Sequence, residues 1–268
     1  MAFEELKALQ AEKWGAAPWE RFAGPSMADI HDDLVRRLGV RAGEQWLDLA
    51  TGTGAVATRA ARQGAVVTGL DLAPKMIETA RRLAAEDGLE ITYEVGDVED
   101  LPHPDASFDT VSSAMGVIAA PDHAAVAREL ARVCRPDGRI GLAAWRPGGY
   151  QARQMELGAK YLPPPPEGMG NVLDWGRRDY AAEMLGAAFD LEFFDGESPE
   201  RGESPEWLWE MLSSSVGPAK AMLDVLDADG QAQLRADFIE DWGRYRTADG
   251  TVAMPREYLI ILGHRKTR

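Results

Sequence analysis

Short apolar runs alternate along the first half of the chain with segments in which apolar residues recur every three or four positions. The apolar runs predict strands at residues 45–49, 66–70, 91–95, 108–113 and 140–144. The segments with helical periodicity predict helices at about 27–39, at 55–63, from Pro74 onward and at about 122–134. Because strands that alternate with helices form parallel sheets with right-handed crossovers, this half of the chain predicts an α/β fold.

The second half of the chain has a different texture. After Trp145 the chain reaches a run of prolines at 163–166, which cannot join a central strand. Two more strands are expected at 191–194 and 258–263, and they flank a helical insertion at about 204–245. This part therefore predicts the remaining strands of the sheet together with a cap.

Local signals refine two of these helices. Ser26 and Asp29 have the spacing of a capping box at the start of the helix at 27–39. The sequence 204–206 supplies an N-cap serine, a first-turn proline and a first-turn acid. One helix face of the insertion is strongly apolar, with Leu234, Phe238 and Trp242 at four-residue spacing.

The composition is that of an acidic globular protein. The 268 residues are 45% apolar and 27% charged, with a formal net charge of −15 at pH 7. That charge repels an extended polyanion from the average surface, so nucleic acid is not expected as a substrate. No apolar stretch approaches the ~18 residues that span a bilayer, and the acidic start of the chain is unlike a secretory signal. We therefore expect a cytoplasmic protein without a membrane span.

The single cysteine, Cys134, excludes an intramolecular disulfide and a zinc site built on several cysteines. We expect Cys134 to be a core residue of the helix at about 122–134. No metal site is expected, and the sequence leaves open whether the chain forms a homodimer.

The most informative motif is Asp48-Leu-Ala-Thr-Gly52-Thr-Gly54, at the end of the first predicted strand. Its glycines open the helix at 55–63, so the backbone turns sharply and comes close to a ligand. Gly52-x-Gly54-x-x-Ala57 also satisfies the dinucleotide pattern, so a nicotinamide-dependent oxidoreductase is one interpretation. Asp48 favours another, because a carboxylate repels a pyrophosphate at a helix N-terminus but suits a ligand ammonium group.

Two further acids follow strand ends. Asp71 ends the second predicted strand, and its two oxygens have the spacing to accept hydrogen bonds from both hydroxyls of a ribose. Asp97 follows the third strand and can accept from an adenine amine, while Val98 offers an apolar contact to the ring. Together the three acids favour S-adenosyl-L-methionine over NAD as the cofactor.

Five motifs stand in register along this half of the chain. They are Trp46-Leu-Asp-Leu-Ala-Thr-Gly-Thr-Gly54, Gly69-Leu-Asp-Leu-Ala-Pro-Lys-Met76, Gly96-Asp-Val-Glu-Asp-Leu-Pro102, Phe108-Asp-Thr-Val111 and Arg132-Val-Cys-Arg-Pro-Asp-Gly138. Together, over roughly residues 14 to 146, they resemble the class I S-adenosylmethionine-dependent methyltransferases. The small-molecule branch that includes the ubiquinone/menaquinone-biosynthesis methyltransferases is the most similar.

The resemblance implies a Rossmann-like, doubly wound, seven-stranded and mostly parallel sheet with a reversed last strand, for which 258–263 is the candidate. Since a prior of about 150 residues per domain does not force a second one, we expect a single domain over residues 1–268, which the resemblance makes a methyltransferase domain. In that domain, residues 1–40 form an N-terminal helical lid and 41–146 the cofactor-binding core. Residues 147–268 supply the remaining strands and the helical cap insertion at about 204–245.

The resemblance assigns cofactor contacts as well. It implies that the glycine motif lines the methionine part, that Asp71 with Leu72 holds the ribose, and that Met76 packs beside the adenine. Residues 114–115 would approach the transferable methyl. The candidate cofactor-binding residues are Asp48, Ala50, Thr51, Gly52, Gly54, Asp71, Leu72, Met76, Asp97, Val98, Ala114 and Met115.

No catalytic base is assigned. Some relatives carry a histidine where this chain has residues 118–119, Ile and Ala. His31 lies on the apolar face of the helix at 27–39 and is expected to be a packing residue with satisfied polar atoms. His103 and His123 are expected to face solvent, and His264 to be structural. Methyl transfer from a sulfonium needs mainly alignment and exclusion of water, so positioning is expected to supply most of the acceleration.

Aromatic residues gather in two further places. Trp14, Trp19 and Phe22 precede the helix at 27–39, and the resemblance implies that this stretch folds over the cofactor. The cap region contains Trp175, Trp207, Trp209, Trp242 and Tyr245. Such residues usually pack in a core. The alternative interpretation is a largely apolar acceptor pocket roofed by the N-terminal segment and the insertion.

The expected function is methyl transfer from S-adenosyl-L-methionine to a small, largely apolar or aromatic metabolite, with S-adenosyl-L-homocysteine as the other product. Two alternatives stay open at this point. One is an NAD-dependent oxidoreductase, and the other is a non-catalytic scaffold that binds S-adenosylmethionine.

Overall fold

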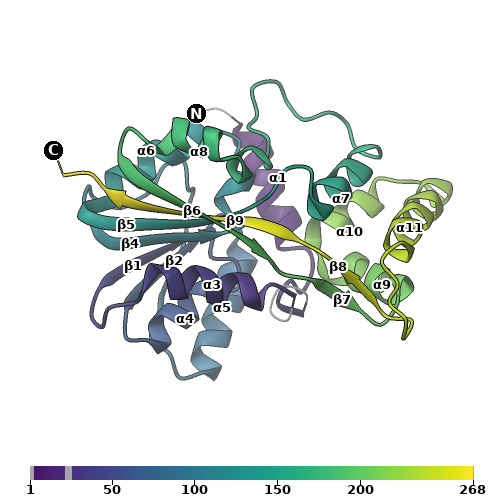
Figure 1. Cartoon of the computed structure of the whole chain (residues 1–268), viewed down its shortest axis with the longest axis horizontal. Helices are drawn as coiled ribbons and strands as arrows, with labels where there is room; N and C mark the ends of the chain where they lie inside the picture. Colours follow the sequence, from purple (N-terminus) through teal and green to yellow (C-terminus); the bar gives the residue numbers. More distant parts are fainter. Residues whose placement is uncertain (1–2, 22–25, 268) are drawn as a thin grey trace.

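The computed structural model describes residues 3–21 and 26–267, and its centre is a seven-stranded sheet (Figure 1). The strands lie in the order β3-β2-β1-β4-β5-β9-β6. Their bounds are β1 Gln45–Leu49, β2 Val66–Asp71, β3 Thr92–Val95, β4 Phe108–Ala114, β5 Cys134–Trp145, β6 Phe189–Glu197 and β9 Glu257–Arg265. Neighbouring strands are parallel except at β9, which is antiparallel to both β5 and β6. The Rossmann-like sheet with a reversed last strand is confirmed.

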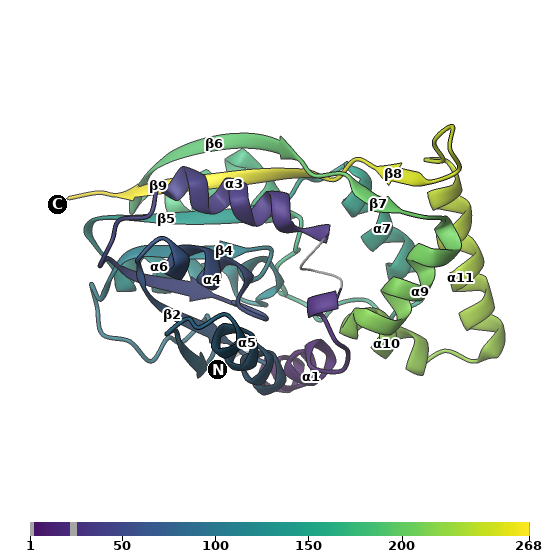
Figure 2. The same cartoon turned by 90° about the horizontal axis from the view of Figure 1, so that it is seen from below.

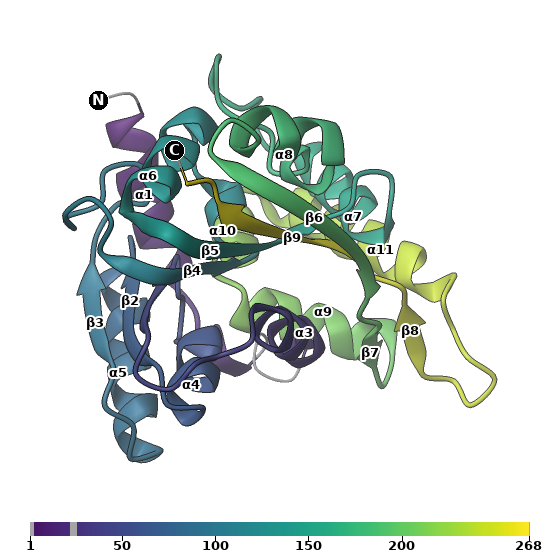
Figure 3. The ribbon, with the colours of Figure 1, turned by 60° about the vertical axis from the view of Figure 1, so that its left-hand side comes forward.

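Helices cover both faces of this sheet. Those that flank it are α3 Ala28–Leu38, α4 Ala55–Arg62, α5 Pro74–Glu86, α6 His123–Val133 and α8 Arg178–Leu185. The first three lie on one face, and α6 and α8 lie on the other (Figures 1 and 3). Strands covered on both sides read as continuous apolar runs, and in β1 the side chains of Trp46, Leu47 and Leu49 are fully buried.

Two local predictions in the first half of the chain are wrong. Met27, not Ser26, is the N-cap of α3, and no side chain caps the helix. The Ser26 hydroxyl instead accepts a hydrogen bond from Arg256, at 2.9 Å. Cys134 is buried but begins β5 rather than ending a helix, because it pairs with Phe108 of β4 at a shift in strand register.

A second, smaller core lies beyond the sheet, on the right of Figure 2. The elements there are α7 Tyr150–Ala159, α9 Pro205–Ser215, α10 Gly217–Asp224, α11 Ala228–Gly243 and the hairpin of β7 Glu200–Gly202 with β8 Val252–Met254. The predicted capping of α9 is confirmed, since Ser204 accepts from the N–H of Trp207 at 3.1 Å. The apolar face of α11 is buried as predicted, at Leu234, Phe238 and Trp242.

In the described part of the chain, three helices have no counterpart in the sequence-based prediction: α1 Glu4–Trp14, α7 and α8. Their apolar residues follow helical spacing only weakly. In α1 the one buried side chain is that of Lys7. Among the described residues, no helix has both the length and the apolar character needed to cross a membrane.

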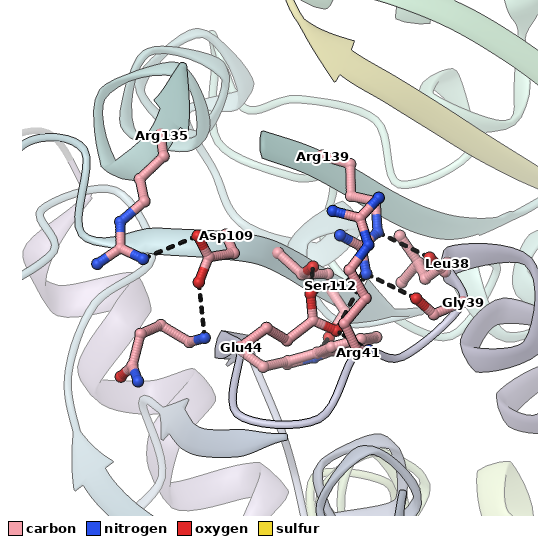
Figure 4. A network of polar contacts seen from close by, with 11 residues as sticks. Leu38, Gly39, Arg41, Glu44, Asp109, Ser112, Arg135 and Arg139 are labelled. Carbon is pink, nitrogen blue, oxygen red and sulfur yellow. Dashed lines mark hydrogen bonds and ion pairs between the residues drawn. The ribbon is translucent and has the colours of Figure 1, made fainter. Parts of the chain in front are cut away.

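A buried ion pair lies at the amino ends of the central strands (Figure 4). Arg139 of β5 donates to both oxygens of Glu44, at 3.0 and 2.9 Å, and to the carbonyl oxygens of Leu38 and Gly39. Glu44 also accepts from the Thr110 hydroxyl at 3.0 Å. The two charged side chains are only 8% and 5% exposed. This edge therefore joins β1, β4 and β5 through charges that satisfy one another.

Candidate functional site

A cavity lies at the carboxyl ends of β1, β2 and β4, the edge at which open α/β sheets bind ligands. Its volume is about 990 Å³, including space that is open to solvent. It is lined by Lys7, Gln10, Trp14, Trp19, Met27, His31, Ala50, Thr51, Gly52, Thr53, Ala55, Asp71, Leu72, Met76, Asp97, Val98, Ala114, Met115, Gly116, Ala119, Ala120 and Pro121. The cavity therefore reaches from the glycine turn after β1 to the residues that follow β2, β3 and β4.

The turn after β1 brings bare backbone to this cavity. Ala50 has a φ of 47°, a left-handed conformation that is uncommon outside glycine. Gly54, with a φ of 85°, is the N-cap of α4. A Cβ at Gly54 would lie 2.2 Å from the hydroxyl oxygen of Tyr93. Gly54 does not line the cavity, but it lets α4 begin close to the sheet, while Gly52 is part of the cavity wall.

Asp71 ends β2 and lines the cavity. One of its oxygens accepts from the N–H of Gly52 at 2.8 Å, and the other accepts from the N–H of Ala73 at 2.9 Å. Burial raises the pKa of Asp71, and these N–H groups oppose the rise. Each carboxylate oxygen can accept a further hydrogen bond. Asp71 is therefore held in place and still has capacity for two hydroxyls of a ligand.

Asp97 is shared between the cavity and the N-terminal helix. The Lys7 ammonium of α1 lies 2.7 Å from one Asp97 oxygen and 2.5 Å from a Glu99 oxygen. The other Asp97 oxygen accepts from the N–H of Glu99 at 2.9 Å. Burial acts to lower the pKa of Lys7, but the bonds to the two carboxylates outweigh it and the pKa is raised. Lys7 therefore stays charged, and α1 is held by ion pairs rather than by an apolar face.

Sequence reasoning missed Lys7 and Gln10, because α1 has no apolar stripe that reveals it. Gln10 donates to the carbonyl oxygen of Ala119 at 3.0 Å. Figure 2 shows α1 between α5 and α10. Gly217 of α10 lies so close that a Cβ there would meet the Lys13 carbonyl oxygen at 1.9 Å. No signal in the sequence alone connects α1 to these distant partners.

Asp48 does not line the cavity. It is buried beneath the turn, where one oxygen accepts from the Thr51 hydroxyl at 2.6 Å and the other from the Ser112 hydroxyl at 2.7 Å. Burial raises the pKa of Asp48 to about 6, against the lowering effect of these hydrogen bonds. The direct contact with a ligand ammonium that the sequence suggested is not available in this arrangement. Instead, Asp48 holds Thr51, which does line the cavity.

The end of β4 forms another wall. Met115 has a φ of 57°, and a Cβ at Gly116 would lie 2.5 Å from the Cβ of Ala50. A left-handed conformation costs a non-glycine residue about 1 to 2 kcal/mol, and such residues cluster at ligand sites. Ala50 and Met115 are both left-handed and both line the cavity, as expected for a site that binds a ligand.

His31 lines the cavity from α3, so the expectation of a satisfied packing residue is wrong. It is 5% exposed, and its Nδ1 has no hydrogen-bond partner among the described residues. Burial, followed by the charge of Arg59, lowers the pKa of His31 to about 4, while Asp32 acts in the opposite direction. His31 is therefore a neutral imidazole at neutral pH. The helical spacing placed it on an apolar face, but which part of that face meets the cavity depends on how α3 packs.

The other histidines lie outside the cavity. His123 is buried rather than solvent-facing, with Nδ1 2.8 Å from the Tyr180 hydroxyl. The His103 side chain is 13% exposed and packs edge-on against Phe108. Both predictions of a solvent-facing ring fail because aromatic neighbours from other elements cover them. The side chain of His264 is 60% exposed.

The aromatic residues separate into two groups. Trp14 and Trp19 line the cavity with ring centroids 5.3 Å apart, whereas Phe22 lies outside the described residues. The aromatic residues of the cap pack in the two cores: Trp175 in the main one, and Trp207, Trp209, Trp242 and Tyr245 in or against the second. Within the described part of the chain, no residue after Pro121 lines the cavity. The expectation that the cap aromatics pack in a core is confirmed, and the alternative of a roof from the insertion is wrong, since α10 contacts α1 instead.

A sheet with a reversed last strand, a tight glycine turn after β1 and acids after β2 and β3 define an α/β enzyme that binds a nucleoside cofactor. Residues 47–138 match the family model described as a methyltransferase domain. The chain belongs to the class I S-adenosylmethionine-dependent methyltransferases.

Known proteins with and without an assigned activity are similar to this chain. Over 258 residues, 95% of this chain and 93% of the relative, it is 32% identical to the uncharacterized protein Rv1403c of Mycobacterium tuberculosis. Over 110 residues, 40% of this chain and 46% of the relative, it is 42% identical to the ubiquinone/menaquinone biosynthesis C-methyltransferase UbiE of Bdellovibrio bacteriovorus. Phosphoethanolamine N-methyltransferase 2 of Haemonchus contortus, solved in complex with S-adenosyl-L-methionine, has a similar fold, with a TM-score of 0.58 and 18% identity over 89% of this chain and 53% of that one.

Membership of this family makes S-adenosyl-L-methionine the cofactor of this enzyme. The cavity fits it, because the carboxylates of Asp71 and Asp97 offer acceptors for a nucleoside and suit a ligand that carries positive charge. These relatives give no support to an NAD-dependent oxidoreductase.

Proposed function

We propose that the cavity holds the nucleoside part of S-adenosylmethionine through the ends of β2 and β3. Asp71 with Leu72 would bind the ribose, and Asp97 with Val98 would bind the adenine, beside Met76. The observation that carries this proposal is the state of Asp71. Both of its oxygens are oriented by backbone N–H groups, yet both can accept another hydrogen bond at the cavity wall.

We propose further that the methionine part lies along the backbone of Ala50, Thr51 and Gly52. Asp48 would act indirectly, by holding Thr51 in place. Gly54 would also act indirectly, by letting α4 begin close to the sheet. Ala114 and Met115 would lie near the transferred methyl, since the end of β4 adjoins the turn after β1.

We propose a small and largely apolar or aromatic methyl acceptor. The walls contributed by Trp14, Trp19, Met27 and Met115 support this, because such surfaces stabilise a flat apolar molecule. A similar protein is named for ubiquinone/menaquinone biosynthesis, which is consistent with a ring-bearing acceptor.

The bound cofactor supplies a methyl group on a sulfonium. The chain must hold the acceptor atom in line with that methyl at about 3 to 3.5 Å and keep water out. Trp19 lies 3.9 Å from the position of a Cβ on Gly52, and with Trp14 it forms part of the cavity wall. S-adenosyl-L-homocysteine lacks the sulfonium charge, so Asp71 and Asp97 attract it less than they attract S-adenosyl-L-methionine.

We propose that residues 1–40 are a lid over the cofactor-binding core of residues 41–146. The Lys7–Asp97 contact and the packing of α1 on α10 support this role. Residues 147–268 would complete a single domain with the remaining strands and the cap at about 204–245. A cytoplasmic location and the absence of nucleic-acid substrates stay predictions, and a homodimer stays open.

Asp71→Ala tests the cofactor assignment. We expect the dissociation constant for S-adenosylmethionine, measured by calorimetry, to rise by about 10- to 150-fold, or ~1.5 to 3 kcal/mol, because a charge-assisted hydrogen-bonding group is lost. Asp87→Ala is the matched control, since Asp87 pairs with Arg62 on the surface. An unchanged dissociation constant in folded Asp71→Ala would refute the ribose assignment.

Calorimetry of the wild type with both cofactors, together with an assay of methyl transfer, separates the alternatives. Micromolar binding of NAD without a response to S-adenosylmethionine would support an oxidoreductase. Binding of S-adenosylhomocysteine without methylation of any acceptor in a broad panel would support a non-catalytic scaffold. Transfer of a labelled methyl group to a phenolic or other aromatic acceptor is the expected result.

A further inference from the structure

The two ends of the cavity differ in charge. Lys7, Asp71 and Asp97 line it at the carboxyl ends of β2 and β3. His31 comes from α3, which packs against α4, β4, β5 and β9, so it lies on the other side of β1. Of the lining residues, His31 is the one titratable side chain on that side.

Apolar residues line the cavity together with His31. Met27 lies one helical turn before it on the same face of α3, and Trp19 and Met115 also line the cavity. The charged groups that act on the imidazole are Arg59 of α4 and Asp32 of its own helix. Burial and the charge of Arg59 lower the pKa of His31 and Asp32 opposes them, so the ring is uncharged at neutral pH and does not repel a cationic cofactor.

The His31 ring is buried at some cost. It is 5% exposed, and its Nδ1 has no partner among the described residues. An unsatisfied buried polar atom costs about 1 to 3 kcal/mol, so each one in a folded protein calls for an explanation. Because His31 lines the cavity, a ligand bound there can contact its ring.

We propose that His31 is a catalytic residue that accepts a hydrogen bond from the acceptor's O–H group and takes its proton during methyl transfer. The proposal rests on the proposed function and deepens it, because it defines the acceptor class as phenols or enols. Such acceptors carry a dissociable proton on the atom that is methylated.

The step balances in atoms and charge. The acceptor oxygen forms the new bond to the methyl carbon, and the bond from that carbon to sulfur breaks with its electron pair left on sulfur. The O–H proton passes to the His31 imidazole. The positive charge of the sulfonium disappears as the imidazolium forms, so the site holds one positive charge before and after, and His31 then releases the proton to solvent. A general base contributes about 10²- to 10⁴-fold to the rate, most when its pKa lies near the working pH, so the low pKa of His31 favours the lower end of that range.

The experiment compares His31→Phe and His31→Gln with the wild type. His264→Gln is the matched control, since His264 is exposed on β9. The acceptor probes are 2-naphthol and catechol, with N,N-dimethylaniline as an aromatic acceptor that has no dissociable proton. Binding of S-adenosylmethionine is measured by calorimetry, and kcat and KM are measured by transfer of a labelled methyl group.

We expect both His31 variants to bind S-adenosylmethionine within about twofold of the wild type and to lose about 100-fold in kcat with the phenols. The wild-type rate is expected to be nearly independent of pH between about 6 and 8. The rate of His31→Phe is expected to rise about tenfold per pH unit, because the acceptor must then ionise on its own. His264→Gln is expected to match the wild type.

Each other outcome overturns the proposal in a distinct way. Unchanged kcat and pH profiles in the variants would make His31 a packing residue. A tenfold loss of S-adenosylmethionine affinity with normal turnover would make it a ligand of the amino-acid part. Transfer to N,N-dimethylaniline but to neither phenol would exclude the acceptor class, as would wild-type binding of the cofactor without transfer to any of the three probes. Failure of the wild type to bind S-adenosylmethionine would instead refute the proposed function.

Discussion

Buried charges lie at both edges of the same sheet, and the two edges use them differently. At the amino edge, the Arg139 guanidinium and the Glu44 carboxylate bond to each other and to groups of neighbouring segments (Figure 4). At the carboxyl edge, Asp71 keeps capacity for further hydrogen bonds, and His31 has an atom without a partner among the described residues.

The extent of pairing distinguishes buried polar groups that stabilise the fold from those that serve a ligand site. A buried charge costs free energy unless it is paired, and at the amino edge the pairing is complete within the chain. At the carboxyl edge some pairing capacity is reserved next to a cavity. A buried polar group beside a cavity indicates a ligand site when the protein leaves some of its hydrogen-bonding capacity unused. Buried charge alone does not indicate a ligand site.

The largest effect is expected at the amino edge. Arg139→Met removes one partner of a buried pair and leaves Glu44 as an uncompensated charge, which costs about 3 to 5 kcal/mol of unfolding free energy. Urea unfolding monitored by fluorescence measures the loss. The folded fraction should bind S-adenosylmethionine with unchanged affinity, because Arg139 does not line the cavity.

The double variant Arg139→Met with Glu44→Gln controls for the unpaired charge and should recover part of the lost stability. If Arg139→Met were as stable as the wild type, the amino edge would not be the structural edge of the sheet. If it lost cofactor affinity while folded, the two edges would be coupled.

The next effect concerns the ion pairs of Lys7 with Asp97 and Glu99, called here the α1 latch, which hold α1 at the cavity. Lys7→Met removes the cation between Asp97 and Glu99 and should lower the free energy of opening α1 by about 1.5 to 3 kcal/mol, the scale of hydrogen bonds to charged groups. Hydrogen exchange of the α1 amides measures it. Lys13→Met on the same helix is the control, since Lys13 does not line the cavity. Equal exchange in both variants would contradict the latch.

The strands of the sheet could be predicted because each buries both faces and therefore reads as an apolar run. β1 matches its prediction at both ends, and β2, β3 and β4 match to within one residue at each end. The glycine turn and the acids that follow the strands were equally visible, because parallel strands bring their ends to one edge of the sheet. Ten of the twelve candidate residues line the cavity, all except Asp48 and Gly54.

What could not be predicted depends on contacts between distant segments. Lys7 meets Asp97 across 90 positions, and Ser26 meets Arg256 across 230. Neither pairing leaves a periodic signal, so the sequence predicts no helix at residues 4–14 and favours Ser26 as a helix cap. His31 was placed on the correct helix, but only the packing of α3 determines that its ring meets the cavity.

Acidification should reveal two opposing effects at the carboxyl edge. The pKa of His31 is lowered from 6.5 to about 4, so the unfolded chain binds more protons in that range and stability falls as pH falls through it. The pKa of Asp48 is raised from 3.8 to about 6, so the folded chain binds more protons and stability rises as pH falls through that range. Each slope is at most about 1.4 kcal/mol per pH unit.

His31→Gln removes the first effect and keeps the second. Relative to the wild type, the variant should therefore gain stability as pH is lowered from about 7 to 5, by up to ~1.4 kcal/mol per unit. Urea midpoints at matched pH values measure the difference, in which the other titrating groups cancel. Parallel curves for the two proteins would show that His31 keeps its ordinary pKa in the folded state.

The smallest effect is expected at a hydroxyl. The Tyr93 oxygen is buried beside Gly54 and has no hydrogen-bond partner among the described residues, so Tyr93→Phe should leave the unfolding free energy unchanged or raise it by up to ~1 kcal/mol. At the amino edge, Thr110→Val is the matched change, and it should cost about 1.5 kcal/mol because that hydroxyl donates to Glu44. Both are measured by urea unfolding. Equal losses in the two variants would mean that Tyr93 has a partner, and the carboxyl edge would then hold its polar atoms as fully as the amino edge does.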